Sequence, residues 1–193
     1  MTRPITGETW GDEVDGVRAY LLAEAELPLA RLRLKLAAAR GALLAELDGV
    51  SDAQAELRPA GGEDEDAWGI AEALRHVASI ESIMAQRVRL LGLGLPVDVQ
   101  ATYAGYMEGV DTRRLPALIE ALAASYDALL AAVAAIEGDE RLDTFEPHRR
   151  FGPLNCRAWL AMHTLHLQDH ARQIARLKSL PAYRTAVDDS SAF

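Results

Sequence analysis

Cysteine, aromatic residues and long apolar runs are all scarce in this chain of 193 residues. The single cysteine, Cys156, excludes an internal disulfide framework and a cysteine-rich zinc module. Aromatic residues make up only 6% of the chain, which disfavours a sheet-rich fold because strands are built largely from aromatic and β-branched residues. Charged residues interrupt every apolar stretch before it reaches the roughly 18 residues that a membrane helix needs. The N-terminal residues also lack the apolar core of a signal peptide, so we expect a cytoplasmic protein with no membrane partner.

Positive charge is in the minority as well. The chain has 20 Lys and Arg against 29 Asp and Glu, which gives a formal net charge of −9. An acidic protein repels phosphate backbones, so binding to nucleic acid would need a local basic patch. The basic residues of the last quarter are spread over a loop and a helix, as is typical of a solvated face. We therefore expect no nucleic-acid partner.

Alanine and leucine dominate what is present. The chain contains 35 Ala and 28 Leu, and these are among the strongest helix formers. Apolar residues recur at helical spacing in four long segments, which end at glycine or proline. These segments cover approximately residues 28–48, 67–91, 112–137 and 155–179. Asn155 is expected to cap the last of them. A shorter helix is expected at about 12–26.

The pattern predicts an all-α protein, a four-helix bundle formed by residues 28–180. Residues 1–27 are interpreted as an N-terminal extension that includes the short extra helix. Residues 181–193 are interpreted as a loosely ordered C-terminal tail. The polar stretch 51–66 and the segment that precedes residue 155 are expected to be loops.

Three of the five histidines, His163, His166 and His170, lie in the last predicted helix. His166 and His170 are four residues apart, so they are neighbours on one helix face and can direct their nitrogens at one ion. Chance, or a need for polarity in the core, is the alternative explanation of this pair. His163 is about 10.5 Å of helix rise from His170, too far to share an ion with it easily. It is either a proton shuttle or substrate contact beside the site, or a partly buried polar neighbour.

A third ligand has to come from another helix. His76 lies on or beside the apolar stripe of the second predicted helix, where it is either a hydrogen-bonded core residue or a ligand. Bundle cores are where metal sites are assembled from facing helices, so His76 is the candidate. Two tryptophans, Trp68 and Trp159, are interpreted as core anchors or as residues that stack on a substrate.

Other polar residues lie near these positions. Asp169 and Gln173 are candidates for orienting the ligand histidines, although both point partly away from the His166 and His170 direction. Glu81 is interpreted as a surface or interhelix ion-pair residue. His148 is expected to be exposed, and Cys156 to be a small buried apolar residue.

Two segments resemble the DinB/YfiT-like superfamily. In the last helix, His166, His170, Gln173 and Ile174 stand in the register of a family pattern of a histidine, three residues, a second histidine and then Gln-Ile. In the second helix, Trp68, His76 and Glu81 match a tryptophan followed by a histidine, with an acid five residues later. The resemblance covers residues 28–180 and implies a four-helix bundle in which His76, His166 and His170 hold a divalent metal ion.

The resemblance also implies a class of chemistry. Three protein ligands leave a position open, as in catalytic zinc sites, and imidazole ligands suit Zn, Ni, Cu or Fe, of which Zn and Ni are favoured. The implied functions are a thiol-dependent S-transferase or isomerase that uses a low-molecular-weight thiol, or a metal-assisted hydrolase, acting on a small molecule. Thiol transfer is preferred because no carboxylate base is evident beside the ligands. The alternative is a non-enzymatic metal-binding or stress-response bundle, and a homodimer packed through helices is expected.

Overall fold

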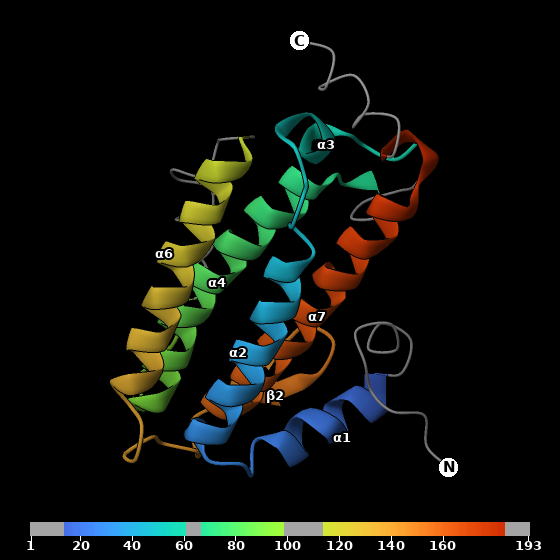
Figure 1. Cartoon of the computed structure of the whole chain (residues 1–193). Coiled ribbons are helices and arrows are strands. Elements are labelled where there is room, and N and C mark those ends of the chain that lie inside the picture. The colour runs from blue at the N-terminus through green and yellow to red at the C-terminus, as the bar shows by residue number, and fades with distance from the viewer. Residues whose placement is uncertain (1–13, 61–66, 99–113, 184–193) are drawn as a thin grey trace.

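The computed structural model describes residues 14–60, 67–98 and 114–183. Within these ranges four long helices stand side by side, and a short helix lies at each end of the bundle (Figure 1). The long helices are α2 (Leu29–Ala45), α4 (Ile70–Gly92), α6 (Leu115–Ala134) and α7 (Cys156–Ser179), and the short ones are α1 (Val14–Glu24) and α3 (Asp52–Glu56). The prediction of an all-α four-helix bundle with a short extra N-terminal helix is confirmed.

Local chemistry fixes where the long helices begin. The Gly69 N–H donates to the Glu72 carboxylate at 3.0 Å and so caps the start of α4. Asn155 caps α7 as predicted, because its side-chain oxygen accepts from the Ala158 N–H at 3.0 Å. A proline occupies the first turn of α6, where its missing N–H costs no hydrogen bond.

Contacts between α4 and α6 show that these two helices run parallel. Ser125 on α6 donates to Glu81 on α4, which lies 44 residues earlier in the sequence. Ile136, just after α6, packs against Gly92 of α4, which also lies 44 residues earlier. Contacting residues keep a constant separation in sequence along two helices only if both helices run in the same direction. The connection between α4 and α6 includes residues 99–113, which lie outside the described residues.

A second parallel pair is formed by α2 and α7. Arg157 donates to the carbonyl of Ala25 and Lys178 donates to that of Glu46, in both cases across 132 residues. In contrast, α4 and α7 are antiparallel, because His76 meets His166 whereas Arg87, further along α4, lies over the ring of Trp159 earlier in α7. This antiparallel register determines which residues of α4 face the histidines of α7.

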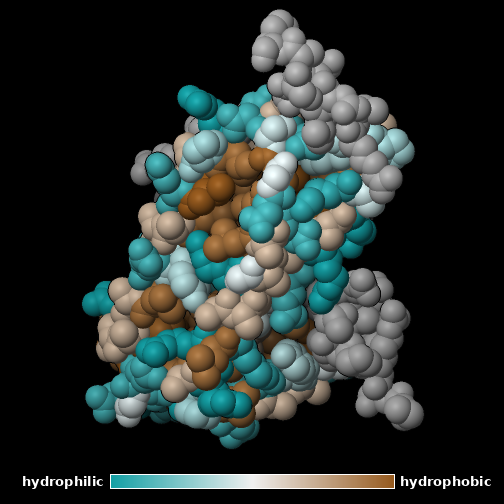
Figure 2. All heavy atoms as spheres, in the orientation of Figure 1, coloured by the Kyte–Doolittle hydropathy of each residue, from teal (hydrophilic) through white to brown (hydrophobic). Residues whose placement is uncertain are grey.

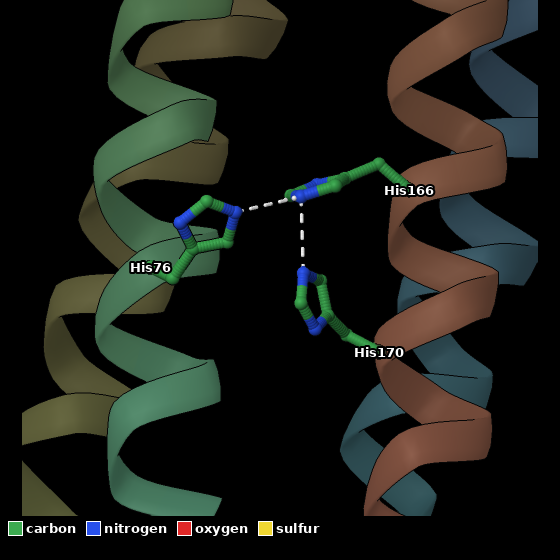
Figure 3. Close-up of side chains that lie close together, drawn as sticks. All are labelled: His76, His166 and His170. Atoms are coloured by element: carbon green, nitrogen blue, oxygen red, sulfur yellow. Dashed lines mark hydrogen bonds between the residues drawn. The ribbon is translucent and has the colours of Figure 1, made fainter. Parts of the chain in front are cut away.

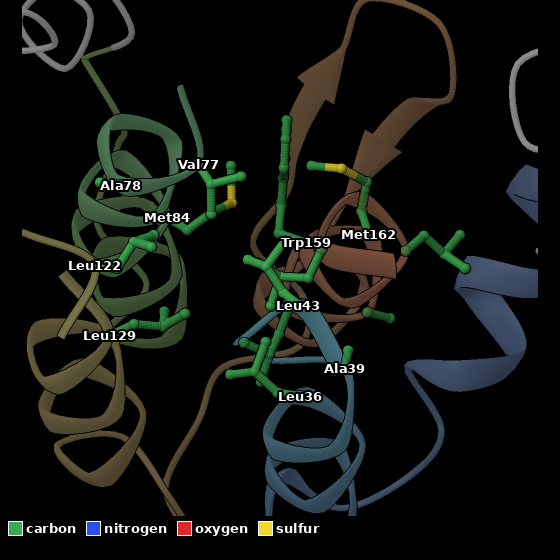
Figure 4. Close-up of a cluster of buried hydrophobic side chains, with 14 of the residues drawn as sticks. Leu36, Ala39, Leu43, Val77, Ala78, Met84, Leu122, Leu129, Trp159 and Met162 are labelled. Atoms are coloured by element: carbon green, nitrogen blue, oxygen red, sulfur yellow. The ribbon is translucent and has the colours of Figure 1, made fainter. Parts of the chain in front are cut away.

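The core lies between the long helices, each of which contributes large side chains (Figure 4). Leu36 and Leu43 come from α2, and Leu122 and Leu129 from α6, and all four are fully buried. The short helix α1 adds Val17 and Leu21 to the same core and packs against α7. Cys156 is buried, in agreement with the prediction from sequence.

The surface is hollowed between the upper parts of α2 and α6, where apolar residues are exposed (Figure 2). Few contacts join these two helices directly. Arg40 of α2 bridges them, because its Nη2 donates to the carbonyl of Leu122 on α6 at 2.6 Å. Its guanidinium also lies 4.3 Å from the ring centroid of Tyr126. Arg40 therefore connects α2 with α6, the two helices that border the hollow.

Two segments that were expected to be loops contain regular structure. Residues 51–66 include α3, where Ser51 and Gln54 form a capping box, and the spacing of these two residues is a signal for this helix in the sequence. Before α7, the strands β1 (Glu146–His148) and β2 (Gly152–Leu154) form an antiparallel hairpin. Strands of three residues, each containing a proline, are too short to show a two-residue alternation. The expectation of a loosely ordered tail falls on residues 184–193, outside the described residues.

Helix α6 is long and apolar enough to cross a membrane by length and composition alone, with a mean hydropathy of 1.6 over its best window. It passes this test despite Glu120 and Asp127, whereas the sequence analysis counted such charges as interruptions. In the bundle it packs along the length of α4. A single helix of this kind is weak evidence for a membrane span.

Candidate metal centre

His76 of α4 and His166 and His170 of α7 point their side chains at one another (Figure 3). The Nε2 atom of His166 lies 3.0 Å from Nε2 of His76 and 3.0 Å from Nε2 of His170. One ligand atom from each residue lies within 4.8 Å of the other two. The structure therefore brings together the three residues that the sequence analysis proposed as ligands.

The backbone explains this convergence. His166 and His170 are one helical turn apart on α7, and the antiparallel α4 presents His76 at the same height. His170 is 2% exposed and His166 is 8% exposed, whereas His76 is only partly buried. The site is therefore closed toward the core and is more accessible near His76.

The hydrogen-bond pattern of the three imidazoles fits a shared cation better than a set of internal bonds. His170 Nδ1 donates to Gln173 Oε1 at 2.7 Å, which leaves the His170 Nε2 lone pair free to accept. His166 Nε2 carries at most one proton, so it cannot donate fully to both nitrogens that lie 3.0 Å away. Nitrogens about 2.1 Å from a tetrahedral ion lie about 3.4 Å apart, so small outward shifts would accommodate the ion.

Burial keeps the three imidazoles in the neutral form that binds metals. It lowers the pKa of His76 to about 3 and holds the pKa of His166 well below its usual value. Burial also lowers the pKa of His170, although the Gln173 hydrogen bond and the charge of Asp169 oppose this shift. A neutral imidazole presents a lone pair, so the site needs no deprotonation to bind an ion near neutral pH.

These pKa values predict how the metal-free protein responds to acid. An unfolded histidine takes up a proton near pH 6.5, whereas the folded imidazoles of His76, His166 and His170 resist it. Stability is therefore complete above pH 6.5 and is lost as pH falls toward the lowered folded values. Each histidine contributes a slope of up to about 1.4 kcal/mol per pH unit. Denaturant unfolding in chelator at pH 7.5, 6 and 5 measures this loss.

The matched control replaces all three histidines by glutamine and keeps His148, whose pKa burial lowers to about 4. This variant should lose clearly less stability between pH 6.5 and 5. Carboxylates with lowered pKa values, such as Glu72, contribute only below their usual value of 4.5, outside this window. An equally steep loss in the control would show that the three histidines are not the cause.

Gln173 holds His170 in the orientation that ligation requires. Replacing Gln173 by Ala should lower the affinity for Co²⁺ by roughly 10- to 100-fold, because the His170 ring loses the acceptor that fixes its tautomer. Gln173→Glu keeps an acceptor and should retain the affinity. Gln168→Ala, on the same helix beside the groove between α2 and α7, is the matched control. Equal affinities of Gln173→Ala and Gln168→Ala would contradict this role.

A buried ionic cluster lies on the core side of the site. Glu81 is 0% exposed and accepts from Arg40 Nη1 at 2.9 Å and from Ser125 Oγ at 2.7 Å. Its other oxygen faces His163 Nε2 at 3.3 Å, so this nitrogen carries the proton. We call Arg40, Glu81, Ser125 and His163 the Glu81 cluster. It joins all four long helices.

The interpretation of Glu81 as an interhelix ion-pair residue agrees with this cluster, but a surface position is wrong. Glu81 falls in the same stripe as Leu74, Val77 and Met84, which are buried. Arg40 likewise falls between the buried residues of α2. A charged residue at a core position of each of two helices was the signal that could have revealed the pair.

The remaining candidates occupy distinct places. His163 is 0% exposed and its ring centroid lies 5.7 Å from that of His166, so it is a neighbour of the site and is fully buried rather than partly buried. Asp169 is partly exposed next to His170. The expectation of an exposed His148 is wrong, because its ring stacks on Phe151 and meets Trp159, and its Nδ1 accepts from two backbone N–H groups.

Trp68 lies against the metal centre itself. Its ring centroid is 4.9 Å from that of His76 and 6.4 Å from that of His170. Trp159, in contrast, is a core residue that is 4% exposed and packs under Arg87. The two alternatives stated for the tryptophans therefore separate: Trp159 is a core anchor, and Trp68 borders the candidate site.

A family model described as the DinB superfamily matches residues 35–174, which is well over half of the chain and includes all three histidines. No curated protein and no solved structure matches the chain.

Proposed function

The chain belongs to the DinB superfamily, as the sequence resemblance predicted, and from this premise we propose that it is a metal-dependent enzyme that uses a low-molecular-weight thiol. His76, His166 and His170 hold a divalent ion, Zn²⁺ or Ni²⁺, and a small molecule is the substrate. The reaction is transfer or isomerisation at an electrophilic centre. The observation that carries this proposal is the convergence of three Nε2 atoms from two helices.

The chemistry of the donor set supports an open, reactive site. Three neutral imidazoles would hold a divalent ion without compensating its charge and without completing its set of ligands, which favours an added anionic ligand. When bound, such an ion lowers the pKa of a water ligand or stabilises a thiolate. The chain itself supplies three oriented lone pairs, one of them fixed by Gln173.

Thiol chemistry is favoured over hydrolysis by the state of the buried carboxylate. Hydrolysis at such a site is aided by a general base that can take a proton from water. Glu81 is unsuited to this role, because Arg40 and Ser125 already occupy one oxygen and His163 faces the other. A thiol ionises more readily than water, so next to the ion it would release its proton to solvent without such a base.

Metal and thiol binding test the proposal directly. Protein purified without an affinity tag should contain one divalent ion per chain by elemental analysis, and a chelator should remove it. Reloading with Co²⁺ should give the visible absorption of a tetrahedral site, and 2-mercaptoethanol should add a sulfur-to-cobalt charge-transfer band. Absence of Co²⁺ binding would overturn the proposal. Co²⁺ binding without a response to thiol would favour the non-enzymatic metal-binding alternative.

The homodimer and the cytoplasmic location stay predictions. The outer face of α6 carries exposed alanines and Ile119, which is 39% exposed, so this face is the surface that we propose for helix packing between two copies. Light scattering over a broad range of concentrations tests it, and a monomer throughout would count against the dimer.

A further inference from the structure

The indole of Trp68 lies beside two of the three histidines. Its plane is 11° from that of His170 and 53° from that of His76, at centroid distances of 6.4 and 4.9 Å. Trp68 comes from the turn that precedes α4, whereas His170 comes from α7, so the indole spans both helices of the site. The indole therefore borders the metal centre and is not part of the hydrophobic core away from it.

The side of the centre that faces the core is closed by protein. His163 lies beside His166 and is 0% exposed, and behind it Glu81 is also 0% exposed. His76 and Trp68 are both partly exposed. The metal centre therefore meets the surface on the side of His76 and Trp68, and a molecule that approaches the ion does so from that side and not from the buried side of the Glu81 cluster.

The turn that carries Trp68 is rigidly held. A Cβ atom on the adjacent Gly69 would lie 2.4 Å from the carbonyl oxygen of Leu57, so only glycine allows this close approach. The Gly69 N–H donates to Glu72, and Arg58 pairs with the same carboxylate. The backbone next to the indole is thus held in place before any ligand arrives, as is expected of a recognition surface.

We propose that Trp68 is the residue that determines which exogenous ligand the metal centre accepts. The group attached to the ligating sulfur packs on the indole face, so the site selects a thiol that carries an aromatic or extended apolar group next to its sulfur. This inference rests on the proposed function, because it requires an ion held by the three histidines. Trp68 is a specificity-determining residue and does not ligate the ion.

Competition between two thiols on the Co²⁺-loaded protein tests the inference. The probes are benzyl mercaptan, which has an aromatic ring next to its sulfur, and 2-mercaptoethanol, which has none. Titration of the charge-transfer band gives both dissociation constants, and their ratio is the selectivity. Trp68→Ala should reduce this selectivity about fivefold, and Trp68→Phe should retain most of it. The affinity for Co²⁺ should change by no more than a few-fold in either variant.

Trp159→Phe is the matched control, because it removes a tryptophan that packs on Arg87 and His148 and should leave the selectivity unchanged. Benzyl mercaptan should also alter the tryptophan emission of this control but not that of Trp68→Ala. If Trp68→Ala still binds Co²⁺ and keeps the wild-type selectivity between the two thiols, the inference about Trp68 is wrong, whereas the proposed function is unaffected. A wild-type protein that binds no Co²⁺ would overturn the proposed function and this inference together, so the two failures are distinguishable.

Discussion

Replacing His166 by Ala is expected to weaken the binding of Co²⁺ by more than about 100-fold, beyond the effect typical of residues that only orient a ligand. His166 is the central member of the three, because its Nε2 lies 3.0 Å from the Nε2 atoms of both His76 and His170. Its removal leaves two imidazoles on two different helices, with no nitrogen between them. Isothermal titration with chelator-treated protein measures the affinity.

His148→Ala is the control for this experiment. It removes a histidine that packs on the ring of Phe151, in the hairpin of β1 and β2, and not on the three histidines of the site. It should change the Co²⁺ affinity by no more than a few-fold. Circular dichroism should show that His166→Ala keeps its helices, because the core leucines of all four long helices remain. An affinity within tenfold of wild type in His166→Ala would mean that the three histidines do not form the metal site.

The second large effect is expected at Glu81. Glu81→Ala should reduce the free energy of unfolding by about 3–5 kcal/mol, because it leaves the guanidinium of Arg40 buried without its partner. The Arg40 side chain is only 7% exposed, so bulk water does not solvate its charge in place of the lost carboxylate. Denaturant unfolding in the presence of chelator measures this change without any contribution from metal binding.

Two comparisons separate burial of the charge from other causes. Glu137→Ala removes the partner of Arg33 in an exposed pair, with side chains 33% and 41% exposed, and should cost far less. A double variant, Arg40→Met with Glu81→Leu, removes both charges and should recover most of the lost stability. If Glu81→Ala costs no more than Glu137→Ala, the Glu81 cluster does not contribute to stability as argued.

Much of the fold could be predicted from the sequence because it depends on local pattern. Leucines at helical spacing, with glycine or proline at the ends, indicated each long helix, and Asn155 indicated the start of α7. The pairing of His166 with His170 also follows from local geometry, because residues four apart share a helix face in any packing. The hairpin of β1 and β2 was missed because its pairing joins residues that show no pattern of their own.

The third histidine marks the limit of such reasoning. The spacing of apolar residues places His76 beside the buried stripe of α4, but it does not say which helix His76 faces or at what height. The resemblance to a family proposed the match, and the antiparallel register of α4 and α7 brings the nitrogens to 3.0 Å. A slide of one helical turn, about 5.4 Å, would have separated them.

By itself the sequence determined the helices and the pair of histidines on one of them, since both follow from the period of the α-helix. Tertiary structure alone decided the rest of the site: His76 opposite that pair, Glu81 between Arg40 and Ser125, and Trp68 across two imidazoles. The physical reason is that these contacts join helices far apart in the chain. Their geometry depends on the direction and register in which whole helices pack, which no local pattern records.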